Sequence, residues 1–265
     1  MIRYKDNILR DIQISIISHG HGSHVEELLN DLSKLDSASR LQVTVVENII
    51  ETHKILYSEF PYPVKVVTNK KPMGFSENNN IAFINPVNQE SVKYFFVINP
   101  DVRLVNDVFP AITSDLDKDR NIGVIATHTV SYNGSVQDSA REFPTPAGII
   151  RKLLTGDKGI TEHGTTSYCT DWVAGMFMAF RCAVYKEVNG FNQNYRMYYE
   201  DVDICCRITS IGYKIMVRPD LQVIHEGKRD SHRKIKYLFW HITSMVRYFL
   251  SECYKDVVVN KPKNK

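Results

Sequence analysis

Residues 93–101 read KYFFVINPD, and this stretch decides the fold. Tyr94 to Ile98 form a nearly continuous apolar run, which is typical of a strand buried on both faces. The letters NPD that follow are ordinary turn residues. The stretch therefore predicts a central β-strand of an α/β protein, with a polar turn at its carboxyl end.

The sequence on both sides of this run alternates strands with helices. Ile12, Ile14 and Ile16 have the period of a strand, and apolar residues at helical spacing follow Ser23, a predicted N-cap. Further strands are predicted at 41–47, 63–68, 121–128, 171–181 and within 213–225, helices at about 201–211 and 231–253, and a long irregular segment at 129–170. This alternation predicts a mostly parallel central sheet with helices on both faces.

Polar side chains follow the predicted strands at their carboxyl ends. They are His19 and His21 after the first strand, Glu47 and Asn48 after the second, Asn69 after the third, and Asn99 and Asp101 after the central one. Parallel strands bring these ends to one edge of a sheet, where α/β proteins bind their ligands. We therefore expect the functional site at this edge.

Length and composition limit the class of protein. The 265 residues, 43% of them hydrophobic, suffice for one large α/β domain. The longest apolar run, Trp172 to Phe180, has nine residues, about half of the roughly 20 that a membrane-spanning helix needs. The N-terminus lacks the apolar core of a signal peptide, and the five cysteines form no CxxC pair. A cytosolic protein with reduced cysteines is expected.

The loop after the first strand disfavours several nucleotide-binding classes. It reads SHGHGS at 18–23, which matches neither the GxGxxG of dinucleotide folds nor the P-loop. It also lacks the Lys or Arg expected in the first loop of a sugar nucleotidyltransferase. Dehydrogenase, ATPase and nucleotidyltransferase functions are therefore disfavoured.

Two acidic groups can carry chemistry. Asp101 follows a buried strand and is placed to hold Mg²⁺ or Mn²⁺, which needs only one or two protein carboxylates when a diphosphate is also a ligand. Glu200, Asp201 and Asp203 precede a predicted helix and can supply a general base. A helix dipole favours such residues at its N-terminus and would lower their pKa. Turn and cap roles therefore stay open for both groups.

Two further stretches combine binding residues with a structural alternative. Gly74 and the amides of 69–80 offer close backbone approach and hydrogen bonds to a base or ribose, but a loop with a helix cap looks the same. Trp172 and Gly175 offer a sugar-stacking surface and close approach, but they lie in the apolar run, which is also typical of core.

The C-terminal part of the chain is basic. His225 follows the last predicted strand and can ligate a metal or contact a phosphate, as can Lys228 and Arg229, although a lone histidine is also common as a structural residue. From residue 226 onward, ten Lys and Arg stand against four Asp and Glu, and this part of the chain includes the predicted amphipathic helix at about 231–253. An anionic membrane surface, nucleic acid or an acidic partner would suit this charge.

Several motifs occur in a fixed order: SHGH, VVEN, NxxPxGFxxxNN, NPD, DWxxGxFM, NGF, YxEDVD, a late His, and FWHxxSxxRY at 239–248. Together they resemble family 2 inverting glycosyltransferases, and among these the bacterial O-antigen and cell-wall rhamnosyltransferases. The resemblance covers roughly residues 10–250. It implies a GT-A fold, with a Rossmann-like, mostly parallel sheet flanked by helices, a nucleotide-diphosphate sugar donor and a divalent cation.

The resemblance also implies roles for single residues. Asp201 takes the position of the catalytic base, with Glu200 as the reserve. Asp101 takes the last position of the family's D-x-D-like element, with His225 as a second candidate metal ligand. The expected donor-binding residues are His19, Glu47, Asn48, Gly74, Phe75, Asn79, Asn99 and Asp101; Trp172 and Gly175 are expected at the acceptor and sugar pocket, and His225, Lys228 and Arg229 at the phosphates. Asn99 and Glu47 depart from the aspartates that are usual in the family.

Substrates and location follow from the same resemblance. The donor would be dTDP-L-rhamnose and the acceptor a saccharide on a polyprenyl diphosphate, with inversion at the anomeric carbon. Residues 1–227 would form the GT-A domain, and residues 228–265 a basic helical appendage packed on it. This appendage would hold the enzyme on the anionic cytoplasmic face of the inner membrane; a solvated helix or a contact in a homodimer is the alternative.

Three other interpretations of the sequence change the donor sugar, the presence of catalysis or the partner. A UDP- or GDP-linked hexose, N-acetylhexosamine or furanose donor needs the same diphosphate chemistry. A non-catalytic nucleotide-sugar-binding protein would keep the fold, but the intact NPD and the Glu200-Asp201 pair disfavour it. Nucleic-acid binding through the basic tail would be salt-sensitive, yet no recognition motif supports it, so no nucleic-acid partner is expected.

Overall fold

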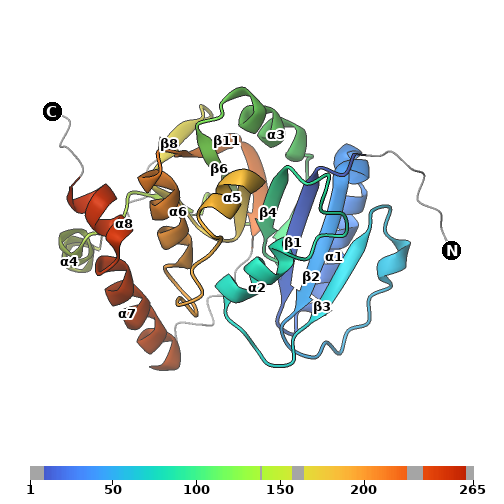
Figure 1. Ribbon diagram of the computed structural model, residues 1–265, viewed down its shortest axis with the longest axis horizontal. Coiled ribbons are helices and arrows are strands. Elements are labelled where there is room, and N and C mark those ends of the chain that lie inside the picture. Colours follow the sequence, from blue (N-terminus) through green and yellow to red (C-terminus); the bar gives the residue numbers. More distant parts are fainter. Residues whose placement is uncertain (1–8, 138, 157–163, 226–234, 261–265) are drawn as a thin grey trace.

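A curled central sheet between layers of helices forms the protein (Figure 1). The computed structural model describes residues 9–137, 139–156, 164–225 and 235–260. The nine-stranded sheet has the order β3-β2-β1-β4-β10-β6-β11-β5, and β8 pairs with β11. Its strands are β1 (Ile12–Ser18), β2 (Leu41–Glu47), β3 (Val64–Thr68), β4 (Tyr94–Ile98), β5 (Val102–Arg103), β6 (Ile122–Val130), β8 (Tyr168–Thr170), β10 (Phe177–Arg181) and β11 (Lys214–His225); β7 (Ala140–Arg141) and β9 (Trp172–Val173) form a second, two-stranded sheet.

The helices fall on both faces of the sheet and at one end of the molecule. They are α1 (Gly22–Ser33), α2 (Phe75–Phe83), α3 (Phe109–Lys118), α4 (Pro146–Thr155), α5 (Cys182–Glu187), α6 (Glu200–Ser210), α7 (Ile235–Phe249) and α8 (Glu252–Tyr254), with shorter turns η1 (Asp36–Arg40), η2 (Tyr57–Glu59) and η4 (Lys255–Val259). This arrangement of strands and helices confirms the α/β prediction.

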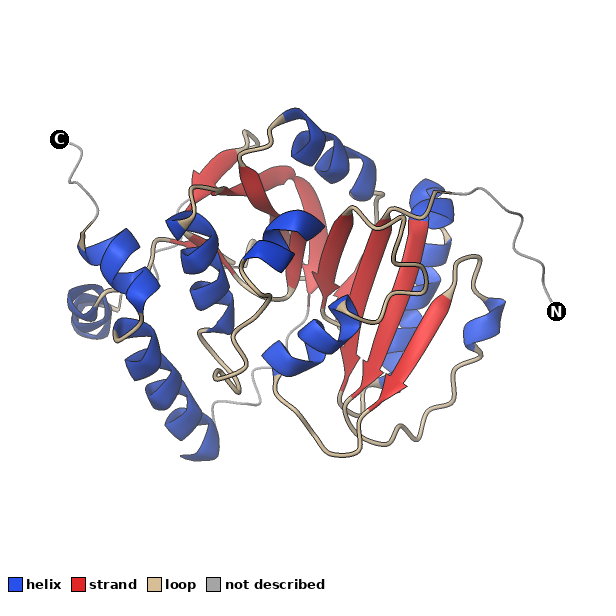
Figure 2. Ribbon diagram, in the orientation of Figure 1, coloured by secondary structure: helices blue, strands red, loops and turns tan. Residues whose placement is uncertain are grey.

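The first half of the sheet is parallel, as the sequence predicts. All five residues of β4 are buried, and β4 pairs in parallel with β1. β1, β2 and β3 also run in parallel, with Ser18 beside Glu47 and Glu47 beside Thr68. The carboxyl ends of these strands therefore meet at one edge, where Figure 2 shows their arrowheads together.

The second half of the sheet is mixed. β10 runs antiparallel to both β4 and β6, whereas β6 and β11 are parallel. The single strand predicted at 171–181 is wrong, because a turn at Gly175 and Met176 separates β9 from β10. The uniform apolar character of this stretch concealed the turn. Its consequence is that Gly175 lies in a loop above the sheet and not within a strand.

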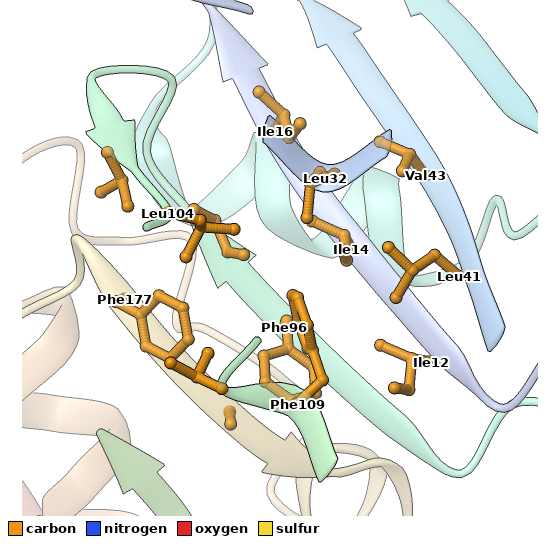
Figure 3. Packing of buried hydrophobic residues seen from close by; sticks show 14 of the residues in the cluster. Ile12, Ile14, Ile16, Leu32, Leu41, Val43, Phe96, Leu104, Phe109 and Phe177 are labelled. Carbon is orange, nitrogen blue, oxygen red and sulfur yellow. The ribbon is translucent and has the colours of Figure 1, made fainter. Parts of the chain in front are cut away.

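Each face of the sheet has its own core. The core in Figure 3 joins Ile12, Ile14 and Ile16 of β1 to Leu32 of α1 and Phe109 of α3. The opposite core contains the apolar residues of α5 and α6 together with Phe95 of β4 and aromatic residues of the C-terminal helices. Burying a side chain of this size contributes about 1.5–3 kcal/mol, so both helix layers are firmly attached to the sheet.

Two boundary predictions need correction. The segment at 129–170 is not wholly irregular, since it contains β7, α4 and β8. Helix α1 begins at Gly22, and His21 is its N-cap residue, so the predicted cap at Ser23 lies inside the helix. In both cases short polar and glycine-rich segments obscured the element boundaries.

The C-terminal helices pack on the second core. Tyr248 of α7 is fully buried, and it contacts Tyr199 and Tyr254, with ring centroids 5.6 and 5.2 Å away. Cys253, Tyr254 and Val257 are buried in the same cluster. Among the residues that the structure describes, no helix is long and apolar enough to cross a membrane.

Candidate active site

An amide network connects the carboxyl ends of the first three strands. The side-chain nitrogen of Asn48 lies 3.0 Å from Nδ1 of His19 and donates to the carbonyl of Met73 at 3.0 Å. Its oxygen accepts from Nδ2 of Asn69 at 3.0 Å and from the backbone nitrogen of Met73 at 2.7 Å. Asn48 thereby fixes the loop before α2 against β1 and β2, while His19 stays exposed.

A carboxylate occupies the first turn of the sheet. Glu51 accepts from the backbone nitrogens of Gly20 at 2.9 Å and Gly22 at 3.2 Å, and from the hydroxyl of Ser18. Such amides at a helix N-terminus are a common binding place for a phosphate. Because the side chain of Glu51 already satisfies them with a negative charge, a donor diphosphate is disfavoured here.

A second polar centre forms where β5 pairs with the end of β11. This antiparallel pairing sets His225 opposite Val102 and brings Nε2 of His225 to 3.3 Å from Oδ2 of Asp101. Burial raises the pKa of Asp101, but the hydrogen bond and charge of His225 outweigh it, and the net pKa lies below the ordinary value. The carboxylate is therefore held in its ionised form.

The tautomer of His225 is set by Gln137. The amide nitrogen of Gln137 donates to the backbone carbonyl of His225 at 2.5 Å, which leaves the amide oxygen facing Nδ1 at 3.1 Å. An oxygen can only accept, so the network assigns the proton of Nδ1 to this bond. The other ring nitrogen, Nε2, then faces Asp101.

This pair fits a divalent cation. Two ligands about 2.1 Å from an octahedral ion and at right angles are about 3 Å apart, close to the separation of Asp101 and His225. A ligating histidine usually donates its other N–H to an acceptor, as His225 does to Gln137. Within the described ranges no group of three or more His, Cys, Asp or Glu could hold a metal, so phosphate and water would supply the other ligands.

The acidic pair lies across one turn from this centre. Oδ2 of Asp201 accepts from the backbone nitrogen of Gly175 at 3.2 Å, and the carbonyl of the next residue, Met176, accepts from Asn99 at 3.0 Å. A Cβ at Gly175 would lie 3.1 Å from the ring of Phe75 and 3.9 Å from Cβ of Asp201. Gly175 is therefore the point where α2, the NPD turn and α6 come together.

Burial changes the acid–base properties of this pair. Burial raises the pKa of Glu200 well above its ordinary value, and repulsion from Asp201 raises it further. Burial also raises the pKa of Asp201, although the amides of Val202 and Gly175 and the charge of Arg141 oppose it. The expectation that the helix dipole lowers these pKa values is wrong, because desolvation dominates. A raised pKa makes a carboxylate a stronger base.

The backbone before the pair is strained. Tyr198 and Tyr199 have φ of 70° and 65°, in the left-handed region that bulky residues rarely adopt. Oε2 of Glu200, whose residue is only 9% exposed, has no hydrogen-bond partner. Strain and an unsatisfied buried oxygen are unfavourable for stability and are common at functional sites.

Helix α7 holds this strained segment in place. Ser244 donates to the carbonyl of Met197 at 3.0 Å, and the ring of His241 lies 5.3 and 5.5 Å from those of Tyr198 and Tyr199. Just before this segment in the chain, the guanidinium of Arg196 lies over the ring of Trp240 of α7, 5.0 Å from the ring centroid. The C-terminal helix thus positions the residues that lead into Glu200 and Asp201.

Trp172 of β9 lies beside β7. Its indole nitrogen donates to the carbonyl of Glu142 at 3.0 Å, and the guanidinium of Arg141 lies 5.8 Å from the ring centroid. The pairing of β7 with β9 sets these two residues opposite each other. Arg141 thus lies beside Trp172, and its positive charge opposes the rise in the pKa of Asp201.

The chain is similar to glycosyltransferases in sequence and in fold. No protein-family model matches the chain. Rhamnosyltransferase WbbL of Escherichia coli K12 is 28% identical over 250 residues, which cover 89% of this chain and 92% of the relative. The N-acetylglucosaminyl-diphospho-decaprenol L-rhamnosyltransferase of Mycobacterium tuberculosis H37Rv is 22% identical over 257 residues, with coverage of 86% and 83%. The crystal structure of GalNAc-T7 with UDP, GalNAc and Mn²⁺ matches with a TM-score of 0.65 at 15% identity, covering 93% of this chain and 48% of that one.

The chain is a glycosyltransferase of the GT-A fold. Two of its sequence relatives are named rhamnosyltransferases and a third, Agl10 of Haloferax volcanii, is named a hexosyltransferase, and the fold match covers 93% of the chain.

The structure of this glycosyltransferase brings together most residues that the sequence singled out. His19, Glu47 and Asn48 lie at the strand ends; Glu47 accepts from Thr68 at 2.9 Å. Asp101 lies beside His225 and Asn99 beside Met176, while Gly175 lies between Phe75 and Asp201. Lys228 and Arg229 lie outside the described residues.

Two of the predicted donor residues have internal neighbours instead. Asn79 is fully buried, where it accepts from Ser15 at 2.7 Å and donates to the carbonyl of Phe75 at 3.1 Å. It holds α2 on β1, away from the surface that a donor could reach. At Gly74 a Cβ would lie 2.8 Å from the carbonyl oxygen of Arg196, so the close approach there is to the protein's own backbone.

Three residues of the site escaped the sequence-based analysis. Glu51 accepts hydrogen bonds from the first turn, Gln137 orients the ring of His225, and Arg141 opposes the rise in the pKa of Asp201. Each of the three comes from a loop or short strand without a motif. Gln137 and His225 are 88 residues apart. Only the charge of Glu51 and Arg141 and the turn residues around Gln137 were visible in the sequence, and none of these signals is specific.

Proposed function

We propose that the enzyme transfers L-rhamnose from dTDP-L-rhamnose to a saccharide linked to a polyprenyl diphosphate, with inversion at the anomeric carbon. The observation that carries the proposal is the Gly175 turn, which contacts Asp201 through its amide and Asn99 through Met176. It lies between a carboxylate suited to a base and a centre suited to a diphosphate. The names of the two sequence relatives support rhamnose as the sugar.

The donor would lie along the carboxyl ends of β1 to β4. His19, Glu47 and Asn48 would contact the nucleoside, and the diphosphate would lie at Asp101 and His225. A Mg²⁺ or Mn²⁺ ion bound by Asp101 and His225 would neutralise charge on the departing diphosphate. The Mn²⁺ in the GalNAc-T7 crystal structure supports a divalent ion in this fold.

Asp201 would act as the base. Its raised pKa favours proton transfer from the acceptor hydroxyl, which attacks the anomeric carbon from the face opposite the diphosphate. One carbon–oxygen bond forms as the bond to the diphosphate breaks, so the configuration inverts. Burial and repulsion from Asp201 raise the pKa of Glu200, which would disfavour a second negative charge beside the reacting atoms.

The acceptor side would be formed by Trp172 and Gly175. The half-buried Trp172 ring would offer its apolar face to a sugar, and Arg141 would face the acceptor's phosphate. Because such an acceptor is a lipid, the enzyme would work on the cytoplasmic face of the inner membrane, with residues 228–265 as an appendage of the domain at 1–227. The burial of Tyr248 against that domain supports this division of roles.

Thermal unfolding with a panel of nucleotide sugars tests the donor. A ligand at 100 times its Kd adds about 2.7 kcal/mol of stability. We expect stabilisation by dTDP-L-rhamnose, increased by Mg²⁺, and little effect of UDP-glucose, UDP-N-acetylglucosamine or GDP-mannose. Selective stabilisation by a UDP- or GDP-linked sugar would retain the enzyme class and reject rhamnose.

A further inference from the structure

Helix α7 has two unlike faces. Its inner face, with His241, Ser244 and Tyr248, contacts the segment before Asp201 and the second core. Its outer face carries large apolar residues. These are Leu238, Phe239, Ile242 and Val246, with Leu250 just beyond the helix, all between 46% and 70% exposed.

Helical geometry places these residues on one continuous strip. At about 100° per residue, Leu238, Phe239, Ile242, Val246 and Leu250 fall within an arc of about 120°. Single exposed apolar side chains are normal on a protein surface, but a contiguous strip marks an interaction site. The strip is therefore a surface that a partner covers.

Helix α4 has the same character. It has no buried residue, and Ile150, Leu153 and Leu154 are 58–82% exposed. Figure 1 shows α4 and α7 at the same end of the long axis of the molecule. Two separate helices at one end thus expose apolar side chains.

The charges of both helices have one sign. Arg151 and Lys152 interrupt the apolar residues of α4, and Lys236 and Arg247 border the strip on α7. Neither helix contains Asp or Glu. Apolar residues beside basic ones are the pattern of helices that lie in the interface of an anionic bilayer.

We propose that α4 and the outer face of α7 dock the enzyme on a bilayer that contains anionic lipid, with the apolar side chains inserted among the acyl chains. A second copy of this chain is disfavoured as the occupant, because it would bring basic helices together with no acidic residue in either to neutralise them. The choice of a bilayer also rests on the proposed lipid-linked acceptor. Since the inner face of α7 contacts the segment before Asp201, docking would hold the active site at the surface from which that acceptor extends.

Vesicle flotation with the full-length protein tests the surface. The probes are vesicles of phosphatidylcholine alone and of phosphatidylcholine with phosphatidylglycerol. We expect binding to the anionic vesicles that salt weakens, and at least tenfold weaker binding by the triple variant Leu238→Ser, Ile242→Ser, Val246→Ser. Ile84→Ser is the matched control, because Ile84 is 68% exposed in a different part of the molecule.

A second variant separates charge from apolar insertion. Arg151→Gln with Lys152→Gln should weaken binding to anionic vesicles several-fold and leave the unfolding temperature unchanged. Equal binding by wild type and the triple variant would overturn the proposal. A wild-type dimer that the triple variant converts to monomer, without vesicle binding by either, would also overturn it and identify the strip as a contact between copies.

Activity on an acceptor with a short, water-soluble lipid distinguishes this proposal from the proposed function. The triple variant should retain wild-type turnover on that acceptor and lose it on one embedded in vesicles. If neither protein transfers rhamnose to the short acceptor while wild type still floats with anionic vesicles, the proposed function fails and the docking surface stands.

Discussion

The ends of β1 to β3 and the start of α6 carry different kinds of polar groups. At the ends of β1 to β3, Asn48 and Asn69 are neutral and bonded to neighbouring loops. At the start of α6, Glu200 and Asp201 are crowded carboxylates with raised pKa values, and they follow two residues with strained backbones. The first arrangement is rigid and suits binding, whereas the second is unfavourable for stability and suits reaction. The following changes should separate the two.

The largest effect is expected from Asp201→Asn. Removing the base should lower kcat by about 10³-fold, within the usual contribution of general base catalysis, and should leave donor binding intact. Turnover assays with dTDP-L-rhamnose measure this. Asp256→Asn is the control, because Asp256 is exposed. Wild-type turnover by Asp201→Asn would remove Asp201 from the role of base.

A smaller effect is expected from Gln137→Leu. Without its amide oxygen, the ring of His225 is no longer held in the tautomer that presents Nε2 toward Asp101. Loss of such an outer hydrogen bond typically lowers metal affinity about 10-fold to 100-fold. Titration of Mn²⁺ followed by electron paramagnetic resonance measures it without any turnover. The control is Gln193→Leu at an exposed site, and equal Mn²⁺ affinity of all three proteins would contradict the assignment.

Ser244→Ala should affect turnover at the acidic pair and leave donor binding unchanged. Ser244 is 2% exposed, and its loss leaves the carbonyl of Met197 without this donor, at a typical stability loss of about 1–3 kcal/mol. We expect kcat to fall several-fold while the Kd of the donor stays unchanged. Ser210→Ala removes an exposed hydroxyl bonded to Arg207 and should alter neither quantity. A changed donor Kd with an unchanged kcat would show that α7 does not act on the acidic pair.

The smallest effect is a pH dependence of stability. The pKa of Glu200 is raised in the folded protein, so the folded state binds more protons than the unfolded state once the pH passes the unfolded pKa of about 4.3. Wild type should therefore lose stability relative to Glu200→Gln as pH rises from 4 to 8. Denaturant unfolding at several pH values measures the difference, and a constant difference would contradict the raised pKa.

Asp101→Asn should show the reverse sign. The pKa of Asp101 is lowered in the folded protein, so its ionised form contributes stability above the unfolded pKa and loses that contribution as pH falls. The same unfolding series applied to this variant should give a difference from wild type that shrinks toward low pH. Together the two variants compare how Glu200 and Asp101 change stability with pH under one set of conditions.

Much of the first half could be predicted from the sequence. β1, β2 and β4 have bounds within a residue or two of the prediction, because alternating or continuous apolar runs are long enough to be unambiguous. The polar residues at their ends could be placed on one edge by topology alone. This is why the sequence could place His19, Asn48 and Asp101 at one edge of the sheet.

The second half could be predicted less well. The apolar run from Trp172 to Phe180 gave no sign of the turn at Gly175, and the pKa of Asp201 depends on packing that is set by tertiary structure. Gln137 acquires its position only when β11 pairs with β5 and β6, which brings distant residues together. Contacts of this kind leave no periodic pattern in the sequence.

The central claim is that Asp101 serves donor binding and Asp201 serves the reaction. Calorimetric titration of dTDP-L-rhamnose with Mg²⁺ into Asp101→Asn and Asp201→Asn tests this claim most directly. Asp101→Asn should bind the donor at least tenfold more weakly than wild type, because the carboxylate beside His225 is lost. Asp201→Asn should bind it as wild type does. Donor affinity that is lost in Asp201→Asn and retained in Asp101→Asn would contradict the assignment of binding and reaction to these two parts.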